Sequence, residues 1–236
     1  MSRPRAVHGV AERRQPPRDA AELLARARSL GGCTVAEVAA EFGRALPLDL
    51  RRNKGWVGEL VECALGARGG SRPEPDFAEL GIELKTIPLS ADGRPRESTH
   101  VCAINLANLA GQRWETSLVR RKLAQVLWMP LVAGNALDLA QRRFGRAWLW
   151  QPTAAEDGVL CQDWEEHMEL LTTGRFDHID ARLGTYLQVR PKAADGRALT
   201  AAADSEGAPS ATLPRGFYLR PVFTRMLVEA ALVAGD

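Results

Sequence analysis

Two carboxylates and one amine lie close together in the sequence and could hold a metal ion beside a phosphodiester. They are Asp76, Glu83 and Lys85, in the segment PEPDFAELGIELKTI that begins at residue 73. Glu83 and Lys85 are two residues apart in an apolar stretch, so on a strand their side chains would project to the same side. Mg²⁺ prefers carboxylate oxygens, and a lysine can orient or deprotonate an attacking water. The pattern predicts a metal-dependent nuclease site, with Asp76 and Glu83 as metal ligands.

This pattern alone is weak evidence, because glutamate and lysine contents of this size give an E-x-K about 0.3 times by chance. The trio could equally be surface ion pairs on an inactive DNA-binding module. Competing chemistries have less support, since no H-E-x-x-H, Walker A, G-x-S-x-G or dinucleotide-binding pattern occurs. The four cysteines form no C-x-x-C pair, which argues against a structural zinc site.

Composition is that of an ordinary globular protein, with 45% hydrophobic and 25% charged residues in a chain of 236. We expect one nuclease domain over residues 1–236 with two lobes, preceded by a flexible basic arm at 1–18. The widely spaced cysteines predict free thiols in a reducing cytoplasm, and no apolar run is long enough for a membrane span. The net charge of +2 neither requires nor excludes nucleic acid.

Local signals predict the elements that would position the trio. Asp19 is an expected N-cap for a helix over 20–27, and Thr34 with Glu37 forms a capping box for a helix over 35–42. A third helix after Gly55 carries Glu62 and leads into the Pro-rich turn. Residues 99–105 are typical of a strand, which we expect to pair with the strand of Glu83.

The second half of the chain predicts three more strands and two helices. Strands are expected at 148–150, 186–192 and 214–220, and a final helix at 223–233. A helix over 161–171 has an inner apolar face, and its acidic residues, Asp163 among them, are expected on a solvated face. The Ala- and Gly-rich stretch 194–210 is expected to be a mobile loop.

Several longer motifs resemble the MutH family of DNA mismatch repair endonucleases. These are Lys54-Gly55-Trp56-Val57-Gly58-Glu59-Leu60, Pro75-Asp76-Phe77, Gly81 to Pro88, Trp114-Glu115-Thr116-Ser117, Arg190-Pro191-Lys192-Ala193-Ala194 and Leu213 to Tyr218. The resemblance runs in order along nearly the whole chain. It implies an α/β fold like that of restriction endonucleases, with a mixed β-sheet flanked by helices and two lobes forming a DNA-binding cleft.

The resemblance also extends the site. It implies that Glu62 and Lys122 join the catalytic trio, with Glu62 as a further metal ligand. It places a second set of residues where the family contacts DNA: Lys54, Arg190, Pro191, Lys192 and Tyr218. All four lysines of the chain then fall at functional positions.

The implied activity is Mg²⁺-dependent nicking of the unmethylated strand at hemimethylated GATC in double-stranded DNA. The implied partners are MutL as the activator and MutS indirectly, with the enzyme itself expected to be a monomer. A GATC restriction endonuclease of the same ancestry remains an alternative; it would cut both strands without a helper protein.

Overall fold

The computed structural model describes residues 14–49, 53, 55–67, 73–132, 138–180, 182–192, 199–203, 206 and 208–234. The helices are α1 (Ala20–Ser29), α2 (Val35–Glu41), α3 (Trp56–Leu65), α4 (Leu118–Leu123), α5 (Ala154–Thr172) and α6 (Pro221–Val233). The strands are β1 (Glu83–Leu89), β2 (Thr99–Ala103), β3 (Val126–Val132), β4 (Arg143–Phe144), β5 (Trp148–Trp150), β6 (Leu187–Pro191), β7 (Thr200–Ala203), β8 (Pro209–Thr212) and β9 (Arg215–Leu219). This confirms the expected α/β class.

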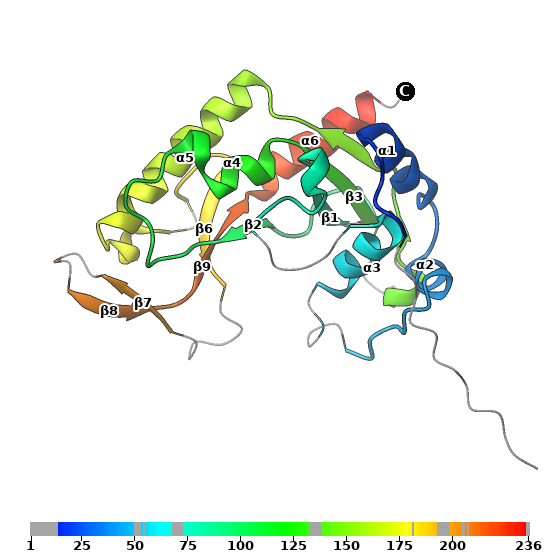
Figure 1. Ribbon diagram of the computed structural model, residues 1–236, viewed down its shortest axis with the longest axis horizontal. Coiled ribbons are helices and arrows are strands. Elements are labelled where there is room, and N and C mark those ends of the chain that lie inside the picture. The colour runs from blue at the N-terminus through cyan, green and yellow to red at the C-terminus, as the bar shows by residue number, and fades with distance from the viewer. Residues whose placement is uncertain are drawn as a thin grey trace, which may run out of the picture.

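A mixed four-stranded sheet lies at the centre of the molecule (Figure 1). β1 pairs with β3 in parallel, and β3 pairs with both β4 and β5 antiparallel. Every residue of β3 except Val132 is buried, as expected for a strand covered on both faces. The chain that connects β1 to β3 contains β2 and α4. This connection places α4 next to the start of β1, where Lys122 of α4 contacts Glu83.

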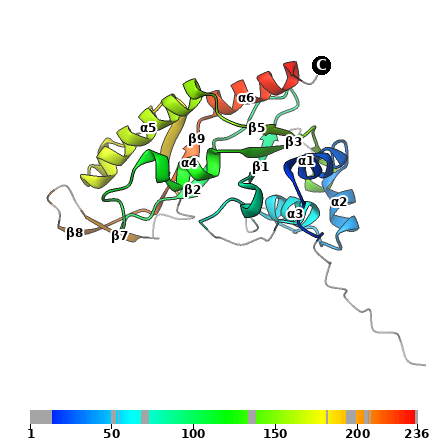
Figure 2. The ribbon, with the colours of Figure 1, turned by 45° about the horizontal axis from the view of Figure 1, so that its top comes forward.

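Two hydrophobic cores lie on opposite faces of this sheet. Along β3, Val126 and Trp128 belong to one core, and Leu127 and Met129 belong to the other. The first core also contains residues of α4, α5, α6 and the second sheet, and the other contains residues of α1, α2 and α3. Figure 2 shows α5 and α6 on the side away from α2 and α3.

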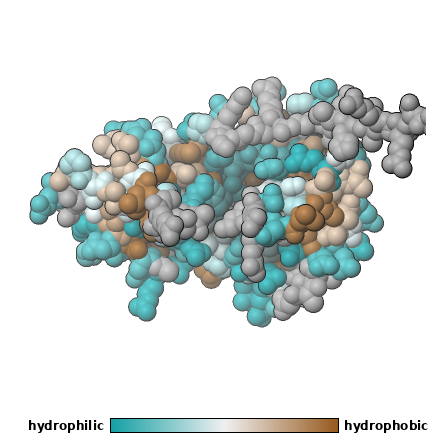
Figure 3. Space-filling model, turned by 90° about the horizontal axis from the view of Figure 1, so that it is seen from below, coloured by the Kyte–Doolittle hydropathy of each residue, from teal (hydrophilic) through white to brown (hydrophobic). Residues whose placement is uncertain are grey.

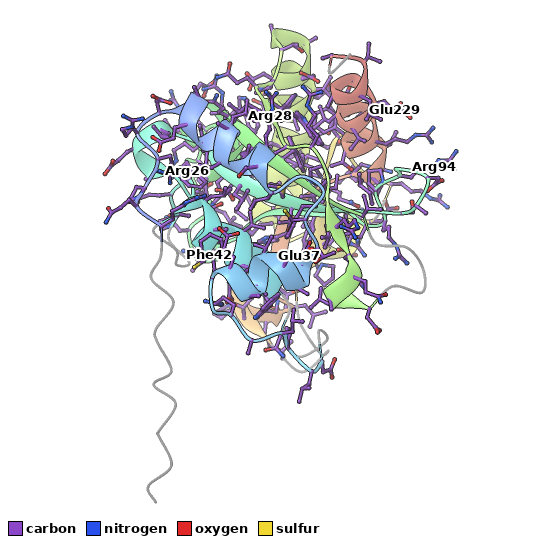
Figure 4. The ribbon with its side chains drawn as sticks, turned by 90° about the vertical axis from the view of Figure 1, so that its right-hand side faces the viewer. Arg26, Arg28, Glu37, Phe42, Arg94 and Glu229 are labelled. Atoms are coloured by element: carbon purple, nitrogen blue, oxygen red, sulfur yellow. The ribbon has the colours of Figure 1, made fainter. Side chains whose placement is uncertain are left out.

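The first three helices form a compact unit whose caps agree with the sequence. The Asp19 carboxylate accepts from the Glu22 N–H at the start of α1, and Thr34 and Glu37 form the capping box of α2. Arg26 fastens α1 to α3 by donating to the carbonyl of Leu65. Figure 4 shows Arg26 on α1 and Glu37 on α2 from this side.

A separate antiparallel sheet has the strand order β2-β9-β6. The expected pairing of the 99–105 strand with the Glu83 strand is therefore wrong. The backbone of β2 bonds to β9, where His100 lies opposite Tyr218, and the edge of β1 is bonded to β3 instead. The fully apolar strand β3 offers β1 a partner that can be buried on both faces, which β2 does not.

Two other expectations need correction. Asp163 is only 3% exposed, because its carboxylate turns inward and accepts from the N–H groups of Thr185, Tyr186 and Leu187. The stretch expected to be a loop contains β7 and β8, which pair with each other over 200–203 and 209–212. This hairpin projects at the lower left of Figure 1.

Candidate active site

A tight turn brings Asp76 back alongside the start of β1. The Phe77 N–H donates to the Ile82 carbonyl at 2.9 Å, and the Ile82 N–H donates to the Phe77 carbonyl at 3.3 Å. A 3₁₀ turn over Ala78–Leu80 and Gly81, whose φ is 67°, reverses the chain between them. The Asp76 Oδ2 atom then accepts from the Leu84 N–H at 2.9 Å. Asp76 and the residues around Glu83 are thus fixed side by side.

Glu83 is the centre of the charged cluster. Its side chain is buried, and its Oε1 atom lies 2.5 Å from the Nζ atom of Lys85. The Nζ atom of Lys122 donates to both Glu83 oxygens, at 3.0 and 2.8 Å. A carboxylate removed from water in this way requires charged partners, and Glu83 has two.

Lys122 reaches Glu83 from α4, a helix whose first turn is capped by the Ser117 hydroxyl. The Lys122 ammonium also donates to the carbonyl of Glu74 at 3.1 Å. It therefore joins β1 to the segment that carries Asp76. Its neighbours Arg120 and Arg121 on α4 are exposed, so the three consecutive cations have different environments.

The two carboxylates of the cluster raise each other's free energy when both are charged. Burial raises the pKa of Asp76, and the negative charge of Glu83 raises it further, against the opposing effects of the Leu84 N–H, Lys85 and Lys122. A divalent cation between Asp76 and Glu83 would relieve this repulsion. Magnesium is commonly held by one or two carboxylates together with waters and substrate phosphates, so this donor set fits such an ion.

Glu62 lies on α3, which packs against β1, and its side chain is partly buried. Within the described residues, no group of three or more histidine, cysteine, aspartate or glutamate side chains is arranged to hold a metal ion. The pair Asp76 and Glu83 is thus assembled with Lys85 and Lys122, while a role for Glu62 in metal binding stays a prediction.

The residues expected to contact DNA gather on the second sheet. Arg190 and Pro191 end β6, exposed Lys192 follows them, and Tyr218 lies on the neighbouring strand β9. The Arg190 guanidinium carbon is 5.9 Å from the centre of the Tyr218 ring. Lys54 lies outside the described residues.

His100 on β2 is near both this group and the charged cluster. Burial, the main cause, and the positive charges of Lys192, Lys85 and Lys122 together lower its pKa to about 4. Its ring packs edge-on against Tyr218, with 5.0 Å between the ring centres. Sequence reasoning missed this residue, because β2 was assigned to the wrong partner strand and a lone histidine carries no motif.

Cys102, two residues beyond His100 on β2, is also near the cluster. Burial raises the pKa of its thiol to about 11, the nearby Lys85 and Lys122 opposing this. The thiol is therefore protonated at neutral pH and is not a candidate nucleophile.

Hydrophilic residues occupy the recessed middle of the face seen in Figure 3, between areas with more hydrophobic residues. No helix among the described residues has the length and apolarity that crossing a bilayer requires.

Comparison with known proteins identifies the family. The family model described as "DNA mismatch repair enzyme MutH" matches residues 65–163. The chain is 51% identical over 215 residues to the DNA mismatch repair protein MutH of Vibrio vulnificus strain YJ016, which covers 91% of this chain and 95% of that protein. It is 52% identical over 209 residues to the MutH protein of Yersinia enterocolitica serotype O:8, covering 89% and 92% of the two chains. The resemblance predicted from the motifs is confirmed, and the chain belongs to the MutH family of DNA mismatch repair endonucleases.

Proposed function

We propose that this endonuclease nicks the unmethylated strand of hemimethylated GATC sites in double-stranded DNA, with Mg²⁺ as its metal. The observation that carries the proposal is the cluster at the start of β1, in which buried Glu83 and Lys122 lie with partly buried Asp76 and Lys85. A site that only stabilised the fold would not require two adjacent carboxylates whose charges oppose each other.

Asp76 and Glu83 would hold the metal, and Glu62 on α3 is proposed as a further ligand. The bound ion would neutralise charge on the phosphate and activate the attacking water. The backbone N–H of Leu84 fixes the orientation of the Asp76 carboxylate, and the ammonium of Lys122 fixes that of Glu83. Both ligands are therefore preorganised, Glu83 on β1 and Asp76 on the segment that is hydrogen-bonded to β1.

Lys85 projects from the same side of β1 as Glu83, so its ammonium lies where it can face the scissile phosphate. We propose that it orients the attacking water and offsets the negative charge that builds up as the water oxygen bonds to phosphorus. The bond from phosphorus to the departing alkoxide then breaks. Lys122, whose ammonium donates to both Glu83 oxygens and to the Glu74 carbonyl, acts through Glu83 rather than on the phosphate.

Arg190, Pro191, Lys192 and Tyr218 are proposed to contact the DNA, together with Lys54. Adenine exposes its N6 atom in the major groove, so a methyl group there changes both the shape and the hydrogen bonding of the base pair. An aromatic ring such as that of Tyr218 can sense this methyl sterically. Arg190 and Lys192 supply cations suited to guanine edges or phosphates.

We further propose that the enzyme works as a monomer in the bacterial cytoplasm and is activated by MutL in its ATP-bound form, with MutS acting through MutL. The decisive experiment incubates the pure protein with a plasmid carrying one hemimethylated GATC site and Mg²⁺, with and without MutL and ATP. We expect slow nicking of the unmethylated strand alone and much faster nicking with both additions.

Two outcomes would contradict the proposal. Cleavage of both strands of unmethylated DNA without MutL would identify a restriction endonuclease. Full Mg²⁺-dependent nicking by both Asp76→Ala and Lys85→Ala would show that the cluster is not catalytic. Glu229→Ala, at an exposed position on α6 (Figure 4), is the matched control and should behave like the parent protein.

A further inference from the structure

Ser98, just before β2, and His100 on β2 contact the two side chains proposed to read DNA, Arg190 on β6 and Tyr218 on β9. The Arg190 Nη1 atom donates to the hydroxyl oxygen of Ser98 at 2.6 Å. The same guanidinium lies near the Tyr218 ring, with 5.9 Å from its central carbon to the ring centre. A long arginine side chain has many rotamers, and these two contacts select one of them.

His100 makes the corresponding contact with Tyr218. The two residues lie opposite each other across the β2–β9 ladder, and their rings meet edge-on at 68°. The His100 Nε2 atom is shielded from solvent and has no hydrogen-bond partner among the described residues. The imidazole therefore serves here by its shape and its aromatic edge rather than as a hydrogen-bonding group.

Gly216 provides the space for this arrangement. A Cβ atom at Gly216 would lie 3.3 Å from the His100 Nε2 atom, 3.3 Å from the Tyr218 Cε2 atom and 3.0 Å from the Cys102 carbonyl oxygen. The absence of a side chain lets the His100 ring lie close to the sheet beside Tyr218. The phenol is then confined by the imidazole and by the guanidinium of Arg190.

We propose that Ser98 and His100 are positioning residues for DNA reading, in which Ser98 fixes the guanidinium of Arg190 and His100 fixes the ring of Tyr218. This rests on the proposed function, in which Arg190 and Tyr218 contact the GATC site. Side chains held in their reading positions before binding lose less conformational freedom when DNA binds. Removing either restraint therefore weakens recognition of the correct site more than it weakens non-specific binding.

The test uses one disruptive and one conservative variant at each position. Ser98→Ala removes the acceptor for Arg190, and Ser98→Thr keeps it; His100→Ala removes the aromatic edge, and His100→Phe keeps it. Nicking is measured with MutL and ATP on hemimethylated GATC, on fully methylated GATC and on a duplex with one altered base pair. Ratios between substrates cancel any difference in the fraction of folded enzyme, so a purely structural defect does not change them.

We expect Ser98→Ala to lower the preference for GATC over the altered duplex about three- to tenfold, mainly through KM. We expect His100→Ala to lower the preference for hemimethylated over fully methylated DNA about two- to tenfold. The conservative variants should retain most of each preference. Ser29→Ala, which removes an exposed serine hydroxyl at the end of α1, is the matched control.

Double-mutant cycles decide between positioning and an independent effect. If Ser98 acts through Arg190, Ser98→Ala adds no further loss to Arg190→Ala, and His100→Ala likewise adds none to Tyr218→Ser. Full additivity in both cycles would overturn the positioning role while leaving DNA reading by Arg190 and Tyr218 intact. If Arg190→Ala and Tyr218→Ser themselves leave both preferences unchanged, the reading role fails, and positioning fails with it.

Discussion

Replacing Lys122 with methionine separates its structural role from that of Lys85. Methionine keeps the length and apolar stem of the side chain but removes the ammonium that donates to both oxygens of Glu83. Removing one partner of a buried ion pair typically costs about 3–5 kcal/mol, because the other charge is left without compensation. Glu83 keeps Lys85 at 2.5 Å, so we expect a smaller loss of about 2–3 kcal/mol in the free energy of unfolding.

Urea denaturation followed by circular dichroism measures this loss, and thermal unfolding should show a decrease of about 4–12 °C in Tm. The matched control is Arg121→Met on the same helix, where the exposed side chain should change stability by less than about 0.5 kcal/mol. Adding Glu83→Gln to Lys122→Met should recover at least about 1 kcal/mol, because the uncompensated charge is then removed. A Lys122→Met protein as stable as the parent, or strictly additive losses in the double variant, would refute this account of the cluster.

Three further outcomes follow from other parts of the structure. Asp163→Asn should lower the free energy of unfolding by about 2–3 kcal/mol, because one of the oxygens that accept backbone N–H groups becomes an NH₂ donor. Urea denaturation measures this loss, and an unchanged midpoint would contradict the proposed contribution of these hydrogen bonds. Gly216→Ala should reduce the preference for hemimethylated over fully methylated DNA by displacing the Tyr218 ring, and an unchanged preference in the nicking assay would argue against that contact. The lowered pKa of His100 means that the unfolded chain binds its proton first on acidification, so this residue should remove stability between pH 6.5 and pH 4. Because the ring is partly exposed and solvent screens part of the shift, we expect a loss of about 1–2 kcal/mol; His100→Phe should lose that part of the pH dependence in urea titrations, and a parallel pH profile would count against it.

Elements with local signals were predicted well from the sequence. The caps at Asp19 and Thr34 require only residues three positions apart, and both are present. Glu83 and Lys85 share a side because strand alternation is also local. Strand pairing is different: β2 is close to β1 along the chain but bonds to β9, more than a hundred residues away. Nothing in the two strand sequences identifies that partner.

The same distinction applies to the site. The position of Asp76 next to β1 could be predicted from the turn that precedes this strand. The contact of Lys122 with Glu83 joins residues 39 positions apart, and a place for Lys122 in the site was expected only from the family resemblance. The burial of Asp163 was missed because an acidic residue on an amphipathic helix usually faces water. Only the backbone of residues 185–187, brought under α5 by the fold, makes burial favourable for this carboxylate.

Strand β1, which pairs with β3 in the mixed sheet, limits how the protein can be divided. Near its start, Ile82 and Leu84 point into the core of α1, α2 and α3, whereas Ile87 and Leu89 point into the other core. Glu83 and Lys85 alternate with Ile82 and Leu84 and so lie on the same face of the strand as Ile87 and Leu89. The charged cluster therefore continues the apolar face that Ile87 and Leu89 form. Neither half of the molecule could be expressed alone without exposing one side of β1 to water. If the chain is cut into two fragments, neither fragment should fold alone, and activity should be lost for that reason. Activity should return only when the two fragments associate and both faces of β1 are covered again.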